Sequence, residues 1–128
     1  MRINIEEVVD ATRGRVRFRS GGDSVDGHWG GPGEIPVGRD LDIEMEVSAE
    51  EIISVRPAFR SSRDPVEQDG GVVVIVGCVE RVGVDGVIEF RAGDDLILLE
   101  QCGPLADVAE GAYIELRVPD LKIYPIDL

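Results

Sequence analysis

Apolar and charged residues alternate one by one along three segments of this chain, 14–19, 40–47 and 112–118. In the second segment, Leu41 and Ile43 alternate with acidic residues. Because successive side chains of a β-strand point to opposite faces, a period of two predicts strands with one buried face. The chain contains 30 Val and Ile residues but only seven Ala, a composition typical of strands rather than helices.

One segment, 71–82, is almost entirely apolar, which predicts a central strand covered on both faces. Turn sequences rich in glycine separate the predicted strands. Two short stretches, 48–52 and 105–109, are the best candidates for helical turns. In the first of them, Ser48 and Glu51 have the spacing of a capping box. Both stretches are too short to determine the architecture.

The chain also contains an internal sequence repeat with an offset of 72 residues. Between residues 14–32 and 86–104, seven of nineteen aligned positions are identical, including Phe18 and its counterpart Phe90. After a small change of offset, a shorter match closes each half, with Ile53-x-Val55-x-Pro57 aligned to Leu121-x-Ile123-x-Pro125. Matching turns and matching apolar rows predict the same meander of strands in each half.

The repeat predicts two halves, 1–59 and 72–128, joined by a linker over 60–71. A half of about 60 residues is marginal for an independent core, so we expect the two halves to share one core. The sequence therefore predicts an all-β fold and a single domain over residues 1–128. Its expected architecture is a single β-barrel or β-sandwich of about 8–10 strands, built from two internally repeated halves.

The charge balance excludes several classes of protein. Asp and Glu number 26 against 13 Lys and Arg, giving a formal net charge of −13, which does not suit a general nucleic-acid binder. The longest apolar run, 72–76, is too short for a membrane-spanning helix. Acidic residues interrupt the first ten positions, where a signal peptide would be apolar, so we expect a cytoplasmic protein. We expect Cys78 and Cys102 to be reduced, half-buried thiols, since neither belongs to a CxxC pair.

Two charged rows with a period of two suggest a cross-strand ion ladder. The basic row is Arg13, Arg15, Arg17 and Arg19, and the acidic row is Asp40, Asp42, Glu44 and Glu46. The arginines could clamp an anionic partner, because guanidinium groups bind carboxylates and phosphates through two hydrogen bonds. If the two strands are neighbours, however, the rows would neutralise one another. We favour the ladder.

The segment Gly27-His28-Trp29-Gly30-Gly31-Pro32 contains the only His and the only Trp of the chain. Glycines allow a backbone to approach a ligand closely, and an exposed Trp is a common anchor at interfaces. The aligned positions in the second half, Glu100 and Gln101, lack both rings. Two interpretations remain open: a binding loop, or a Trp that closes one end of the barrel.

The sequence gives little support for catalysis or for a metal site. A zinc site is not expected with one His and no Cys cluster, and no segment matches a calcium-binding EF-hand loop. There is no nucleophile elbow, phosphate-binding loop or dinucleotide motif. We therefore predict a protein that is not an enzyme and that needs no cofactor and no metal.

The acidity itself suits a basic partner, because charge complementarity speeds association and suppresses wrong partners. Residues 1–68 carry 9 basic and 14 acidic side chains (−5), and residues 69–128 carry 4 and 12 (−8). We predict a non-catalytic acidic protein-binding module, most concretely an immunity or inhibitor protein that neutralises a basic partner. The predicted partner-binding residues are Asp94, Asp95, Glu100, Asp107, Glu110, Glu115, His28 and Trp29.

Two other functions are consistent with the same residues. One is a β-barrel that binds a small ligand or a carbohydrate through the His28–Trp29 loop. The other is a structural subunit that assembles through its sheet edges. The sequence does not determine the oligomeric state.

Overall fold

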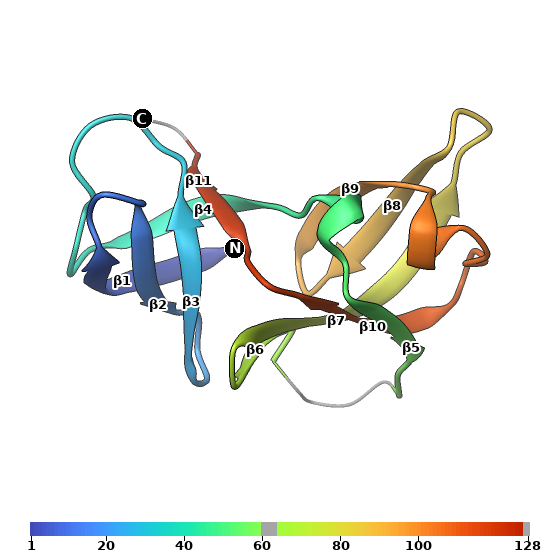
Figure 1. The fold of residues 1–128 in the computed structure, drawn as a ribbon, viewed down its shortest axis with the longest axis horizontal. Coiled ribbons are helices and arrows are strands. Elements are labelled where there is room, and N and C mark those ends of the chain that lie inside the picture. Colours follow the sequence, from blue (N-terminus) through green and yellow to red (C-terminus); the bar gives the residue numbers. More distant parts are fainter. Residues whose placement is uncertain (60–63, 127–128) are drawn as a thin grey trace.

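The structure, a computed structural model, describes residues 1–59 and 64–126. Five strands close into a barrel, and six form a second sheet beside it (Figure 1). The barrel contains β1 (Arg2–Asp10), β2 (Arg15–Arg19), β3 (Ser24–Trp29), β4 (Asp40–Glu46) and β11 (Lys122–Pro125). The second sheet contains β5 (Ser54–Pro57), β6 (Val66–Asp69), β7 (Val72–Val82), β8 (Val87–Ala92), β9 (Asp95–Glu100) and β10 (Tyr113–Val118). The all-β prediction is confirmed, and the described residues form eleven strands.

The barrel and the second sheet have the same basic pairing pattern. In the barrel, β1, β2 and β3 form an antiparallel meander, and β4 pairs with the other edge of β1. In the second sheet, β7, β8 and β9 form an antiparallel meander, and β10 pairs with β7. A common pattern is what the sequence repeat predicts for two related halves. It is a property of the fold, however, and the duplication itself stays a prediction.

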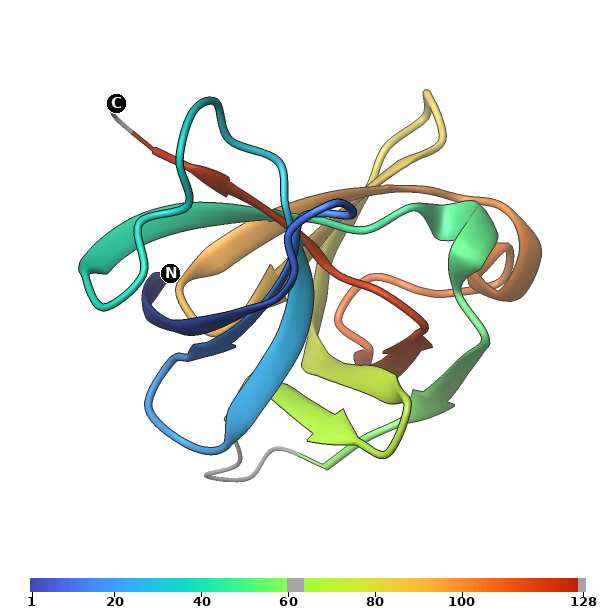
Figure 2. The ribbon, with the colours of Figure 1, turned by 60° about the vertical axis from the view of Figure 1, so that its left-hand side comes forward.

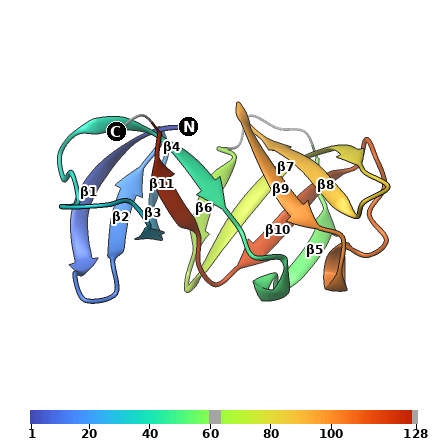
Figure 3. The ribbon, with the colours of Figure 1, turned by 90° about the horizontal axis from the view of Figure 1, so that it is seen from above.

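Two strands cross between the barrel and the second sheet. β5 follows β4 in the chain but pairs with β10 of the second sheet. β11 follows β10 in the chain but pairs with β4 and, in parallel, with β3 of the barrel. Both crossing connections can be followed in Figures 2 and 3. One hydrophobic cluster has members in both parts.

The alternating segments place their apolar rows in this cluster. Val16 and Phe18 of β2, Ile43 of β4 and Leu116 of β10 are all fully buried. β7 is the predicted central strand: it pairs with β10 along one edge and with β6 and β8 along the other. Its residues 73–76 are all buried, so both of its faces are covered, as its uninterrupted apolar sequence indicates.

Three local predictions need correction. The helical turns are 3-10 turns, η1 (Ala49–Glu51) and η2 (Gly103–Leu105), and the second begins two residues earlier than expected. Ser48 lies at the N-cap position of η1, but its side chain makes no capping hydrogen bond, so the capping box is wrong. Part of the expected linker is not a linker, because Val66–Asp69 forms β6; residues 60–63 lie outside the described residues.

The side chain of Gln68, on β6, joins the second sheet to the barrel. Its Oε1 accepts a hydrogen bond from the backbone N–H of Asp26 on β3 at 2.9 Å. Its Nε2 donates to the backbone oxygens of Gly70 at 2.9 Å and Val72 at 3.2 Å. The amide therefore satisfies three backbone groups at once, one of them across the junction.

We expect Gln68→Ala to lower the free energy of unfolding by about 1–3 kcal/mol, because a partly buried backbone N–H loses its acceptor. Urea unfolding followed by Trp29 fluorescence measures this change. Gln68→Glu is the comparison variant: it keeps an acceptor for the Asp26 N–H, but its second carboxylate oxygen would face the backbone oxygens of Gly70 and Val72, so its loss of unfolding free energy should be at least as large. A Gln68→Ala protein as stable as the wild type would show that the bridge contributes nothing.

Candidate functional site

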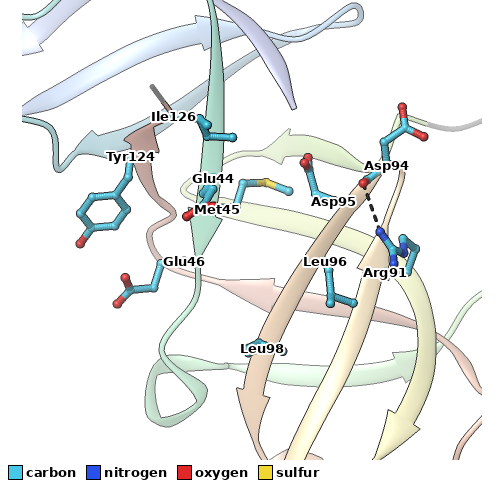
Figure 4. Close-up of a pocket in the computed structure, with 10 residues that line it drawn as sticks. All are labelled: Glu44, Met45, Glu46, Arg91, Asp94, Asp95, Leu96, Leu98, Tyr124 and Ile126. Carbon is cyan, nitrogen blue, oxygen red and sulfur yellow. Dashed lines mark hydrogen bonds between the residues drawn. The ribbon is translucent and has the colours of Figure 1, made fainter. Parts of the chain in front are cut away.

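A groove lies between the outer wall of the barrel, formed by β4 and β11, and β9 of the second sheet (Figure 4). It consists of two adjoining hollows of about 540 and 440 Å³, which share Glu46 and Leu98. We call it the β4–β9 groove. Its larger apolar side chains are Met45, Leu96, Leu98, Tyr124 and Ile126. Its charged side chains are Glu44, Glu46, Glu50, Asp94, Asp95, Glu100, Arg91 and Lys122.

The β9 wall of the groove presents two exposed leucines. Leu96 and Leu98 are 41% and 61% exposed, whereas Ile97 and Leu99 between and beyond them are buried in the core. β9 lies at the end of its sheet and pairs only with β8. A strand with apolar residues on both faces needs cover on both, and fully burying one leucine contributes about 1.5–3 kcal/mol. Within the described residues, the outer face of β9 therefore keeps two leucines that are not covered.

The β4 wall presents carboxylates. Ile43 and Met45 of β4 are buried, and Met45 points toward Asp95 of β9, so Glu44 and Glu46 lie on the other face of β4 and are exposed (Figure 4). Within the described residues, neither of these glutamates forms an ion pair, and neither does Glu100 at the far end of β9. On the side of β4 turned away from β9 (Figure 4), the protein thus keeps the Glu44 and Glu46 carboxylates outside the ion pairs of the described chain, with Lys122 directly opposite Glu46 on β11.

Arg91, the one arginine among the described residues that line the groove, already has partners. Arg91 donates to Glu80 at 2.6 Å and to the backbone oxygen of Asp94 at 3.2 Å, a contact visible in Figure 4. The hydrogen bond to Glu80 is the main cause that raises the pKa of Arg91 above its usual value. The guanidinium is therefore held by the second sheet and leaves the β4 carboxylates free.

The arginine row of β2 forms a ladder, but not with the expected partners. Arg17 lies 2.6 Å from Glu7 and 2.9 Å from Asp26, and its hydrogen bond to Asp26 is the main cause of its raised pKa. The remaining pairs are Arg13 with Asp10, Arg15 with Asp120 and Arg19 with Glu6. The prediction that the β4 acids pair with this row is wrong, because β1 lies between β2 and β4. Of the four β4 acids, Asp42 pairs with Arg2 and Asp40 accepts a hydrogen bond from Asn4, both on β1, whereas Glu44 and Glu46 line the groove.

The acidic residues predicted to bind a partner do not form one surface. Asp94, Asp95 and Glu100 line the groove, although the carboxylate of Asp95 is 2.6 Å from the amino nitrogen of Met1. Asp107 and Glu110 lie between η2 and β10, and Glu110 accepts a hydrogen bond from the backbone of Val82. Glu115, on β10, is 3.1 Å from Arg117. Only the first three lie at the groove.

His28 and Trp29 do not lie in a loop, because they form the end of β3. Trp29 is 6% exposed and belongs to the core, so its ring is not offered as a surface anchor, while His28 is half-buried. The flanking glycines allow close packing of β11 rather than of a ligand. A Cβ at Gly27 would lie 2.9 Å from the backbone oxygen of Leu121, and one at Gly30 would lie 2.3 Å from the Tyr124 ring.

Sequence reasoning missed the leucine wall and misassigned the β4 acids. One signal for the leucines exists: residues 96–99 are four consecutive apolar residues in a strand. In a strand with only one core-facing side, such a run must expose every second residue. The role of Glu44 and Glu46 had no local signal, because it depends on which strands flank β4.

Comparisons with protein-family models, with curated proteins and with solved structures found no match. In the part of the chain that the structure describes, no three His, Cys, Asp or Glu side chains are placed to hold a metal ion. Cys78 and Cys102 are free and half-buried. Residues 1–59 and 64–126 include no helix long and apolar enough to cross a membrane.

Proposed function

We propose that this protein is a non-catalytic binding module for a basic protein and that the β4–β9 groove is its binding site. The observation that carries the proposal is that one groove is lined by the exposed Leu96 and Leu98 and, at its β4 rim, by Glu44 and Glu46, which form no ion pair within the described residues. Burial of the leucines would supply affinity. The carboxylates would select a cationic partner and orient it.

The overall charge supports the same proposal. Six carboxylates and two cations line the two hollows, in a protein of net charge −13. Such a field attracts a basic partner over distances of about one Debye length, roughly 10 Å at 0.1 M salt, and repels acidic ones. An immunity or inhibitor role is the most concrete form of this function, in which the module covers a basic surface that its partner needs.

The alternative ligand site at His28 and Trp29 has less support. The space beside Gly27 and Gly30 is filled by the main chain and side chains of β11, and the Trp29 ring is buried. A small ligand would have to displace β11 from the barrel to use this space.

Affinity capture from a lysate of the source cells tests the proposed function. Immobilised wild-type protein should retain a basic protein in stoichiometric amount at low salt and release it as the salt concentration rises. The double variant Glu44→Lys/Glu46→Lys should bind this protein about tenfold more weakly, chiefly because association slows. Mass spectrometry identifies the bound protein, and biolayer interferometry gives the two rate constants.

The matched control is Asp23→Lys/Glu34→Lys, which changes the net charge equally at exposed positions outside the groove. This variant should bind nearly as well as the wild type. Equal losses in both double variants would mean that net charge alone drives binding, and the groove would no longer be the site. If the wild type captures no basic protein, the proposed function is wrong.

A further inference from the structure

We infer that the free edge of β9 binds one extended segment of the partner through backbone hydrogen bonds, as an additional strand of the second sheet. The inference rests on the proposed function and names the element that the partner presents to the β4–β9 groove. Two features of β9 lead to it: a row of backbone groups without partners, and an apolar edge that nothing in the described chain covers.

The pairing of β9 with β8 determines which backbone groups of β9 remain free. The N–H of Gln101 donates to the backbone oxygen of Gly86 at 2.8 Å, which makes Gln101 a hydrogen-bonded position of this antiparallel ladder. Such positions alternate, so every second residue bonds to β8, and Leu96, Leu98 and Glu100 point their N–H and C=O groups to the open edge. Within the described residues, only the Glu100 oxygen among these groups has a backbone partner. An extended backbone has donors and acceptors that match such a row.

The barrel shows the corresponding edge with a strand bound to it. β3 is the third strand of the barrel meander, as β9 is of the other meander, and β11 pairs with its outer edge. The N–H groups of His28 and Gly30 donate to the backbone oxygens of Leu121 and Ile123 at 2.8 and 2.9 Å. β5, which the sequence repeat aligns with β11, pairs within the described residues only with β10. The second sheet therefore lacks the pairing that closes the barrel.

β9 also lacks the protection that is usual on a free sheet edge. Charged residues, prolines or bulges commonly prevent such an edge from pairing with another chain. The opposite end of the sheet has this protection, because Arg56 and Pro57 of β5 are exposed. On β9, residues 96–99 are all apolar, the pairing with β8 is regular, and Leu96 and Leu98 are exposed. An added strand would cover these leucines and bond the free backbone groups at the same time.

The surroundings of the edge limit the occupant to a single segment. The amino nitrogen of Met1 donates to the backbone oxygen of Ile43 on β4 at 3.1 Å and to the carboxylate of Asp95 on β9 at 2.6 Å, which holds the two strands together at this end. From there the two hollows follow β9 as far as Glu100. A second copy pairing β9 with β9 would have to bring its own barrel wall into this space. A tail or long loop of the partner meets no such obstacle.

The side chains of β9 define the chemistry of this segment. Residues of the added strand that lie beside Leu96 and Leu98 should be apolar, because neighbours on one face of a sheet contact each other. Glu100 lies on the same face of β9 and forms no ion pair within the described residues. The residue beside Glu100 should therefore be cationic, as a basic partner can provide.

A symmetric heptapeptide, Arg-Thr-Val-Thr-Val-Thr-Arg, tests the inference, because it presents the required face in either strand direction. Two further versions carry two backbone N-methyl groups each, one on both valines and the other on the first two threonines. The three peptides have the same side chains, blocked ends and dye. Since only one alternate set of N–H groups faces β9, one N-methylated version should bind the full-length chain about tenfold more weakly than the unmodified peptide. The other version should bind nearly as well, as fluorescence anisotropy at fixed low salt measures.

Variants at Leu98 test the same contact from the protein side. Leu98→Pro removes an N–H at the free edge, where proline is tolerated, whereas Leu98→Ala keeps this N–H. Leu98→Pro should bind the unmodified peptide about fivefold more weakly than Leu98→Ala, and Val84→Ser, outside the groove, should bind like the wild type. In the wild type, which needs no substitution, the peptide should slow hydrogen exchange of the Leu98 amide and leave that of Ile97, which already bonds to β8, unchanged.

Several results would overturn the inference. Equal affinities of the two N-methylated peptides, whether reduced or not, would show that no particular row of backbone groups faces β9. Binding of none of the peptides, or binding that leaves exchange of the Leu98 amide unchanged, would show that the edge takes no strand. Self-association that Leu98→Pro abolishes would make a second copy the occupant. The capture of a basic protein decides the proposed function separately, so a captured protein together with any of these results removes only the added strand.

Discussion

Replacing Leu121 with alanine is expected to lower the free energy of unfolding by about 2–5 kcal/mol. The Leu121 side chain is fully buried where the chain crosses from β10 to β11, and its backbone oxygen accepts a hydrogen bond from the N–H of His28 at 2.8 Å. The substitution leaves a cavity at the point where β11 enters the barrel. Urea unfolding measured by circular dichroism gives the change, with the slope of the transition as a check that unfolding remains two-state.

The matched control comes from the sequence repeat itself. Ile53 aligns with Leu121 and precedes β5 as Leu121 precedes β11, yet Ile53 is 57% exposed. Ile53→Ala should therefore change the free energy of unfolding by less than about 0.5 kcal/mol. The sequence repeat alone would predict similar losses of unfolding free energy for Leu121→Ala and Ile53→Ala, whereas their burial predicts very different losses. Similar measured losses would contradict the full burial of Leu121 in the structure.

The strands were predictable from the sequence because their signal is local. Alternation reports which side chains face the core, and every alternating segment lies on a strand whose apolar row is buried except for the half-buried Leu41 of β4. The uninterrupted apolar run of β7 likewise indicates its central position, since a strand covered on both faces has no polar row. The positions of glycines and their turns follow from the same local chemistry.

Neighbours within each meander were predictable, but pairings between strands far apart in the chain were not, and the candidate site depends on those pairings. β11 enters the barrel and pairs with β4, which places Tyr124 beside Glu44, residues that are 80 positions apart. β1 lies between β2 and β4, which separates the arginine row from the β4 acids. No local pattern encodes either arrangement, because each is a pairing between strands that are not neighbours in the chain. The β4–β9 groove lies at this junction, so its walls come from segments far apart in the chain.

The packing partner of Gly27 and Gly30 was likewise not predictable from the sequence. Gly27 and Gly30 could signal close approach of a ligand or of another strand, and the sequence does not distinguish these two cases. In the structure the approaching element is β11. Trp29 then becomes part of the core instead of an anchor, since the strand that covers the glycines also covers its ring.

Gly77→Ala is expected to lower the free energy of unfolding by about 3 kcal/mol. Gly77 lies within β7, and a Cβ at this position would be 2.1 Å from the backbone oxygen of Arg91 and 2.9 Å from the ring of Phe90. A flexible side chain could move away, but the Arg91 oxygen belongs to β8 and is fixed by the pairing of β8 with β7. Relief of the contact therefore requires the two strands to separate. Urea unfolding gives the size of the effect.

Gly71→Ala is the matched control, because it lies at the other end of the same apolar segment with nothing within 4 Å of its Cβ and no positive φ. It should be neutral or up to about 1 kcal/mol more stable, since alanine restricts the unfolded chain. Separation of β7 and β8 in Gly77→Ala should also move β9, which is held in the sheet only by β8. The amide NMR signals of Leu96 and Leu98 should therefore shift in Gly77→Ala and not in Gly71→Ala. Equal stability of the two variants would show that β7 and β8 are not packed as closely as their backbones indicate.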